Sequence, residues 1–135
     1  MVNLVKLAVG IRDVAQLRAV QAMREERDPP LRHQTRNRPK RADELVEGGS
    51  IYWVIAGAVV VRQRILAVVA DRWDDATVCA GLVLDPVLVP VEARPMKAFQ
   101  GWRYLEDPPG DVVAGRAGGE LPEAMRAELR ALGLL

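Results

Sequence analysis

Residues 5–11 alternate large apolar residues with small or polar ones, a period of two that predicts a half-buried β-strand. Asp13 follows, and its side chain can accept hydrogen bonds from the free backbone N–H groups of a first helical turn, with Gln16 as its capping-box partner. The predicted helix runs to about Arg27 and ends before Pro29, because proline lacks a backbone N–H and restricts the residue before it. The chain is therefore expected to begin with a strand and a helix.

The middle of the chain predicts a β-rich unit, preceded by a short helical turn over residues 42–47 that Gly48 closes with a left-handed backbone. Four β-strands are expected, at residues 50–55, 59–69, 77–84 and 99–105. Trp53 falls on the apolar face of the first strand. On the second strand the odd-numbered residues share one face, and Arg62 and Arg64 project from the other.

The end of the chain predicts a loop followed by a helix. Residues 110–120 are rich in glycine and alanine and indicate a mobile loop. Residues 121–132 carry an apolar stripe at helical spacing and predict a terminal helix. Residues 1–135 are thus expected to form one α+β domain, in which a strand–helix unit leads into a small mixed or antiparallel β-barrel that the terminal helix closes.

Residue counts exclude most catalytic chemistry. The chain has one histidine, one cysteine and one serine, His33, Cys79 and Ser50, so it can form no internal disulfide, four-ligand His/Cys zinc site or conventional Ser triad. Cys79 lies in an apolar run and is expected to be buried. No metal or cofactor is expected, and binding is favoured over catalysis. No apolar run approaches the roughly twenty residues of a membrane span, so a cytoplasmic location without membrane contact is expected.

Charge is distributed unevenly along the chain. The formal net charge is +1, but residues 1–41 hold ten basic and four acidic side chains, a net of +6. The remaining residues therefore carry a net charge of −5. The small total charge does not exclude a polyanionic partner.

Residues 32–41 are half cationic and contain no acid. The cations are Arg32, Arg36, Arg38, Lys40 and Arg41. Guanidinium groups offer planar pairs of donors that match phosphate oxygens, so this composition predicts an anion-binding surface. Arg62 and Arg64, about 7 Å apart on one face of a strand, are expected to extend it. The alternative is a solvated loop whose charges pair with the acids of residues 42–47.

Residues 99–105 contain half of the chain's six aromatic side chains. Trp102 and Tyr104 share one face of the predicted strand. Exposed, they would stack on splayed bases; packed inward, they would supply large residues to a core of valine, alanine and leucine. The scarcity of aromatic residues favours the core.

Four blocks resemble a bacterial family known as domain of unknown function 1489: HQTRNRPKRADEL (residues 33–45), GGSIYWVI (48–55), RQRI (62–65) and FQGWRYL (99–105). The chain is more distantly similar to PUA-like and ASCH-like barrels. That resemblance implies a PUA-like barrel and RNA binding, because such domains mostly bind RNA. Some ASCH-like members hydrolyse modified nucleosides, which implies Thr35, Lys40 and, less directly, Glu44 or Glu47 as catalytic candidates.

The preferred hypothesis is a domain that binds RNA or a nucleotide-like anion through its arginine-rich surface. One alternative is a small amidohydrolase acting on a modified nucleoside. Another is a protein-interaction module without catalysis, which would use the apolar stripe of the terminal helix. The oligomeric state is left open.

Overall fold

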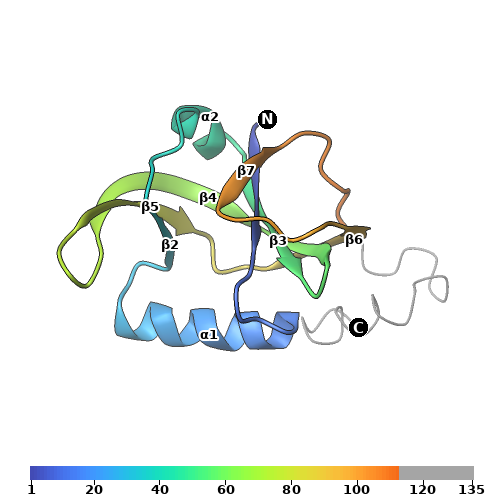
Figure 1. Ribbon diagram of the computed structural model, residues 1–135, viewed down its shortest axis with the longest axis horizontal. Coiled ribbons are helices and arrows are strands. Elements are labelled where there is room, and N and C mark those ends of the chain that lie inside the picture. The colour runs from blue at the N-terminus through green and yellow to red at the C-terminus, as the bar shows by residue number, and fades with distance from the viewer. Residues whose placement is uncertain (113–135) are drawn as a thin grey trace.

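A computed structural model describes residues 1–112, which form two helices and seven strands (Figure 1). The helices are α1 Val14–Arg27 and α2 Ala42–Val46. The strands are β1 Asn3–Leu7, β2 Arg32–Thr35, β3 Ser50–Ile55, β4 Ala58–Arg72, β5 Val78–Leu84, β6 Val89–Pro95 and β7 Trp102–Leu105.

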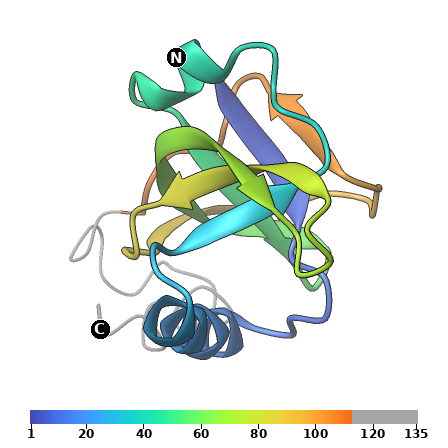
Figure 2. The ribbon, with the colours of Figure 1, turned by 90° about the vertical axis from the view of Figure 1, so that its left-hand side faces the viewer.

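The seven strands make one curled sheet. Its main order is β2-β5-β4-β3-β1-β7, and β6 pairs with β4 beside this path. Only β1 and β3 run parallel among these pairings; the others are antiparallel. Helix α1 lies across one end of the curled sheet and α2 lies at the opposite end (Figure 2). The described residues thus form the small mixed α+β barrel that the sequence predicts.

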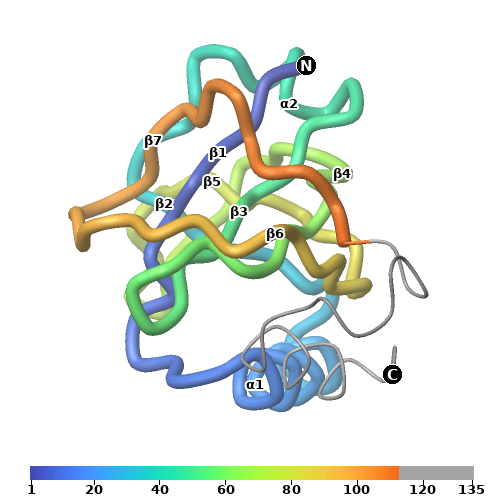
Figure 3. Tube along the Cα trace, turned by 90° about the vertical axis from the view of Figure 1, so that its right-hand side faces the viewer, coloured from blue at the N-terminus to red at the C-terminus, as the bar shows by residue number. Residues whose placement is uncertain are grey.

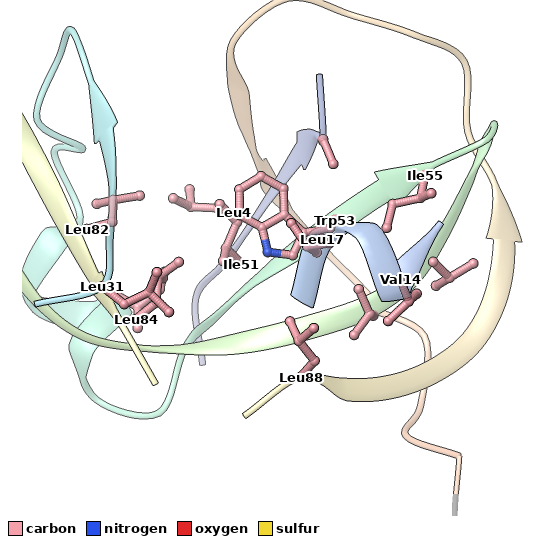
Figure 4. Packing of buried hydrophobic residues seen from close by; sticks show 14 of the residues in the cluster. Leu4, Val14, Leu17, Leu31, Ile51, Trp53, Ile55, Leu82, Leu84 and Leu88 are labelled. Carbon is pink, nitrogen blue, oxygen red and sulfur yellow. The ribbon is translucent and has the colours of Figure 1, made fainter. Parts of the chain in front are cut away.

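Strand β3 is buried along its whole length because both of its faces are covered. Ile51, Trp53 and Ile55 point into the main core, where Trp53 lies near the centre (Figure 4). Tyr52 and Val54 belong to a second cluster. The predicted apolar face of this strand is confirmed, and its other face is also apolar because a second layer packs there.

Two irregularities bend β4. Its register shifts against β6 between Val59 and Val61, and against β5 between Ile65 and Ala67. A bulge adds one residue to a strand and reverses which residues face inward. After the second shift Val68 packs against the core and Val69 is 38% exposed. Before the first shift Val59 belongs to the second cluster, whereas Val60 packs in the main core with Val61. The prediction that all odd-numbered residues of 59–69 share one face is therefore wrong at both ends of the strand.

Helix α1 begins as predicted. Asp13 Oδ1 accepts a hydrogen bond from the backbone N–H of Gln16 at 2.7 Å. Gln16 Oε1 accepts from the backbone N–H of Arg12 at 2.7 Å, one residue before the position that a capping box requires. The short helix α2 is followed by Gly48 with φ +111°, which agrees with the predicted glycine closure.

A buried amide pair joins α1 to the barrel. The side chains of Gln21 and Gln63 exchange two hydrogen bonds, at 2.7 and 2.8 Å. Gln63 Oε1 also accepts from Trp53 Nε1 at 2.8 Å, and Gln63 Nε2 donates to the carbonyl oxygen of Asp85 at 3.1 Å. Gln63 has no exposed surface, and this network satisfies polar atoms that burial would otherwise leave unpaired.

Several boundaries differ from the sequence-based expectation: β6 is an additional strand, β4 continues to Arg72, and β7 begins only at Trp102. Strand β1 ends at Leu7, not at residue 11, because the chain turns and Ile11 N–H donates to the carbonyl of Ala8. Residues 32–35 of the polar run are strand β2, since β5 offers an open edge on which they pair. Residues 110–112, assigned to a mobile loop, bond to β6 through their backbone. The rest of that loop and the terminal helix 121–132 lie outside the described residues.

Candidate functional site

The polar run and the aromatic strand meet where the curled sheet ends. β2 and β7 are the terminal strands of the main sheet order. Trp102 Nε1 donates to Thr35 Oγ1 at 3.1 Å, and the backbone N–H of Arg41 donates to Tyr104 Oη at 3.1 Å. Figure 3 shows β7 beside the segment that links β2 to α2. These contacts define a seam surface, made of residues 36–41 and Tyr104.

The aromatic pair on β7 divides between core and surface. The Trp102 and Tyr104 rings meet edge to face with centroids 5.2 Å apart. Trp102 packs partly against the main core, whereas Tyr104 is 36% exposed. The guanidinium of Arg41 lies 5.7 Å from the centroid of the Tyr104 ring. Trp102 thus follows the core interpretation, and Tyr104 presents an aromatic ring at the seam surface.

Three cations of the run are exposed and unpaired. Arg36, Arg38 and Lys40 take part in no salt bridge within residues 1–112. Arg38 Nη1 donates to the carbonyl oxygen of Val68 at 3.1 Å, which ties the segment to β4. Arg41 pairs with Glu44 in an exposed ion pair, a contact of small energetic value.

Arg32 has a structural role. Its guanidinium donates to Asp71 and to Asp28, and Gln34 Nε2 donates to the same Asp71 carboxylate at 3.1 Å. Gly81 leaves space for this cluster, because a Cβ atom there would lie 3.0 Å from Asp71 Oδ2. The hydrogen bond from Arg32 is the main cause that lowers the pKa of Asp71. The guanidinium of Arg32 is therefore already neutralised.

Replacing Asp71 tests this role. Asp71→Asn removes the charge that neutralises Arg32, and both side chains of this pair are only 15% exposed. We expect a loss of about 2 kcal/mol in the free energy of unfolding at pH 7. Urea denaturation measures it, with Asp74→Asn in the neighbouring exposed turn as the matched control. Equal stabilities of the two variants would contradict the assigned role.

The side chains of Arg62 and Arg64 project from the outward face of β4 as predicted, but they differ in their availability to an external anion. Arg62 forms two hydrogen bonds with Asp111, at 2.8 and 2.7 Å, and donates to Ser50 Oγ at 3.0 Å. Arg64 is exposed and forms no salt bridge in the described part of the chain. Of this pair, Arg64 alone is available to bind an external anion.

The catalytic candidates lie in different surroundings, and Glu47, the alternative to Glu44, is exposed. Thr35 Oγ1 is bonded to Trp102, Lys40 is exposed, and Glu44 is paired with Arg41. None of the side-chain hydrogen bonds between described residues joins any two of them. In residues 1–112 there is also no group of three or more His, Cys, Asp or Glu side chains arranged to hold a metal ion.

A cavity that sequence reasoning missed lies between α1 and the mouth of the barrel. This mouth cleft has a volume of about 150 Å³. Four basic side chains line it: Lys6 from β1, Arg24 from α1, and Arg32 and His33 from β2, of which Arg32 is already bonded to Asp71 and Asp28. Apolar side chains and Trp53 form much of the remaining wall. No single motif predicts the cleft, because its polar residues come from distant segments and only Arg32 and His33 are neighbours in the chain.

His33 is the unusual member of the cleft. Its ring meets Trp53 edge to face with centroids 5.5 Å apart, and its buried Nε2 has no hydrogen-bond partner among the described residues. Burial lowers the pKa of His33 to about 4, and the charges of Lys6 and Arg24 act in the same direction. Burial also lowers the pKa of Lys6. The cleft therefore contains a neutral imidazole beside two cations.

Fold and surface together define a small α+β barrel with a basic seam and a basic mouth. The chain belongs to the family described as Protein of unknown function (DUF1489), whose model matches residues 4–135. Comparison with curated proteins and with solved structures found no match. Neither helix in the described residues is long and apolar enough to cross a membrane.

Proposed function

We propose that this protein binds single-stranded RNA, or a nucleotide-like anion, on the seam surface. The observation that carries the proposal is the junction of the cationic run with the half-exposed aromatic ring of Tyr104. Arg36, Arg38 and Lys40 supply donors for phosphate oxygens, and Arg64 extends the charge along β4. The PUA-like resemblance belongs to the same proposal, since barrels of that kind mostly bind RNA.

This combination of groups suits an unpaired strand. Arginine and lysine neutralise phosphates without reading sequence, whereas an exposed ring stacks on a base whose neighbours have been splayed apart. Stacking contributes about 1–3 kcal/mol per base in such complexes. Tyr104 is held in place by its bond to the Arg41 backbone, so its ring is oriented before a base arrives.

A salt titration tests the charged part of the surface. We expect the Arg36→Gln/Arg38→Gln double variant to bind a fluorescent single-stranded RNA more weakly than the unmodified protein. Its plot of log affinity against log salt should be shallower by about 1.4, because each lost phosphate contact removes about 0.7. Fluorescence anisotropy at several salt concentrations measures both quantities.

Two controls separate charge from stacking and from general effects. Arg18→Gln removes an exposed arginine from α1 and should leave the slope unchanged. Tyr104→Phe should retain the stacking that Tyr104→Ala loses. Absence of RNA binding at low salt would overturn the proposed function, and an unchanged slope in the double variant would overturn the assignment to this surface.

The other two hypotheses receive no specific support from the described contacts. The hydrolase requires Thr35, Lys40 and a carboxylate around one reacting centre. Thr35 is instead bonded to Trp102, and Glu44 is paired with Arg41. The interaction module depends on the stripe in residues 121–132, which lie outside the described part. Cytoplasmic location and the RNA partner remain predictions.

A further inference from the structure

The mouth cleft lies apart from the surface proposed to bind RNA. It opens beside α1, whereas residues 36–41 lead into α2 at the opposite end of the barrel (Figure 2). Strand β2 separates the two places, with His33 near its start and Thr35 at its end. A ligand in the cleft would therefore use a different set of side chains.

Within residues 1–112, acidic side chains balance Arg32 of the cleft but not Lys6 or Arg24. No salt bridge within residues 1–112 involves Lys6 or Arg24. In the described part of the chain, Lys6 Nζ donates only to the carbonyl oxygen of Leu7, at 3.3 Å. Asp28, which lines the adjoining hollow, is already bonded to Arg32 at 3.1 Å. Two cations without an acidic partner among residues 1–112 thus line one space with the buried imidazole of His33.

The adjoining hollow shows how large a ligand the cleft accepts. It has a volume of about 420 Å³ and shares Arg24, Arg32 and His33 with the cleft. Trp73, 37% exposed, forms part of its wall. The inner cleft thus carries the cations Lys6 and Arg24, and the indole of Trp73 lines the outer hollow. This arrangement fits a small anion attached to a flat ring.

We propose that the mouth cleft binds the phosphate monoester of a nucleotide-sized ligand. Lys6 and Arg24 bind the phosphate oxygens, and His33 Nε2 forms a hydrogen bond to the same group. The base lies in the outer hollow against Trp73. A monoester suits the cleft because its two charges match two cations, whereas a phosphodiester of the RNA backbone carries one.

Ligand binding is coupled to a proton on His33. The charged groups that face this residue are Lys6 on β1, Arg24 at the end of α1, Asp28 after it, and Arg32 beside it on β2. Lys6 and Arg24 oppose a charge on the imidazole, whereas Arg32 is neutralised by Asp71 and Asp28. A bound phosphate reverses the local potential and favours the imidazolium, which then donates to the phosphate.

Calorimetric titration with adenosine monophosphate, adenosine and inorganic phosphate tests the cleft. We expect adenosine monophosphate to bind about tenfold or more tightly than either component alone. Arg24→Gln should weaken this binding about tenfold or more, because a charge-assisted hydrogen bond is lost. Arg27→Gln, an exposed arginine on the same helix outside the cleft, should leave the affinity unchanged.

The single histidine of the chain provides a second measurement. Its imidazole resonances report the titration of His33 alone, and adding adenosine monophosphate should raise the pKa from about 4 toward its ordinary value. An unchanged His33 titration, or equal affinities of the Arg24→Gln and Arg27→Gln variants, would overturn the proposal. Both variants lie on an exposed helix face and are expected to fold.

Oligonucleotides distinguish a free nucleotide from the end of an RNA chain as the source of the phosphate. If a 5′-phosphorylated RNA shifts the His33 resonances and the unphosphorylated RNA does not, the ligand is the end of an RNA chain. If adenosine monophosphate shifts these resonances and neither RNA does, the ligand is a free nucleotide. Failure of all three probes overturns the cleft proposal. The Arg36→Gln/Arg38→Gln variant should bind adenosine monophosphate with unchanged affinity. The proposals for the seam surface and for the mouth cleft are therefore tested independently.

Discussion

Gln63→Leu is expected to lower the free energy of unfolding by about 3–5 kcal/mol at pH 7, because it leaves several buried polar groups without partners. Gln63 receives the indole N–H of Trp53 and exchanges two hydrogen bonds with Gln21. Leucine has a similar volume but offers neither donor nor acceptor. Urea denaturation followed by tryptophan fluorescence measures the loss.

A double variant separates the lost hydrogen bonds from the altered shape. Gln21→Leu alone should also destabilise, since it leaves Gln63 partly unpaired. Gln21→Leu combined with Gln63→Leu removes both amides, so its loss should be smaller than the sum of the two single losses. A Gln63→Leu loss below about 1 kcal/mol would show that this network does not hold α1 to the barrel.

The second large effect is a fall in stability with acid that originates at His33. Its pKa is about 4 in the folded chain and about 6.5 when unfolded, so between these values the unfolded chain binds a proton that the folded chain does not. The contribution of His33 is therefore complete above pH 6.5 and is lost as the pH falls to 4. The difference amounts to about 3 kcal/mol.

His33→Phe isolates this contribution from that of the carboxylates. Phenylalanine keeps a ring against Trp53 and cannot be protonated, while Asp71 and Asp111, whose pKa values are lowered, titrate alike in both proteins. We expect the variant to be at least as stable as the unmodified protein at pH 7, and more stable by a growing margin toward pH 4. Denaturation curves at pH 7, 5.5 and 4.5 measure the margin; a constant difference would contradict the His33 assignment.

Local patterns in the sequence were sufficient for most elements of the fold. The N-cap at Asp13, the glycine after α2 and the apolar face around Trp53 each depend on neighbours within a few residues. The sequence does not predict strands β2 and β6, because β2 is polar and β6 contains two prolines; pairing with β5 and with β4 determines their conformations. The predicted inward and outward positions of β4 hold only between its two register shifts, because register depends on the partner strands.

The sequence predicts the candidate site only in part, because contacts between distant segments of the chain cannot be recognised from local patterns. The run of cations and the aromatic strand could be recognised separately, since each is contiguous in the chain. The sequence alone does not show which cations stay available to an external anion. Asp71 and Asp111 neutralise Arg32 and Arg62, and each acid lies far along the chain from its arginine. The alternative interpretation, a solvated loop whose charges pair with the acids of residues 42–47, describes Arg41 correctly, because Arg41 pairs with its near neighbour Glu44.

The sequence by itself determined an α+β chain with few catalytic side chains and a basic N-terminal region, because composition and short-range periodicity are properties of the chain. Tertiary structure alone decided that Lys6, Arg24 and His33 share a cleft and that Gln21 meets Gln63. Such groupings arise when the sheet curls and α1 packs across its end, which brings together residues from distant segments. No local pattern encodes that closure, since its energy comes from burying surfaces on several elements at once.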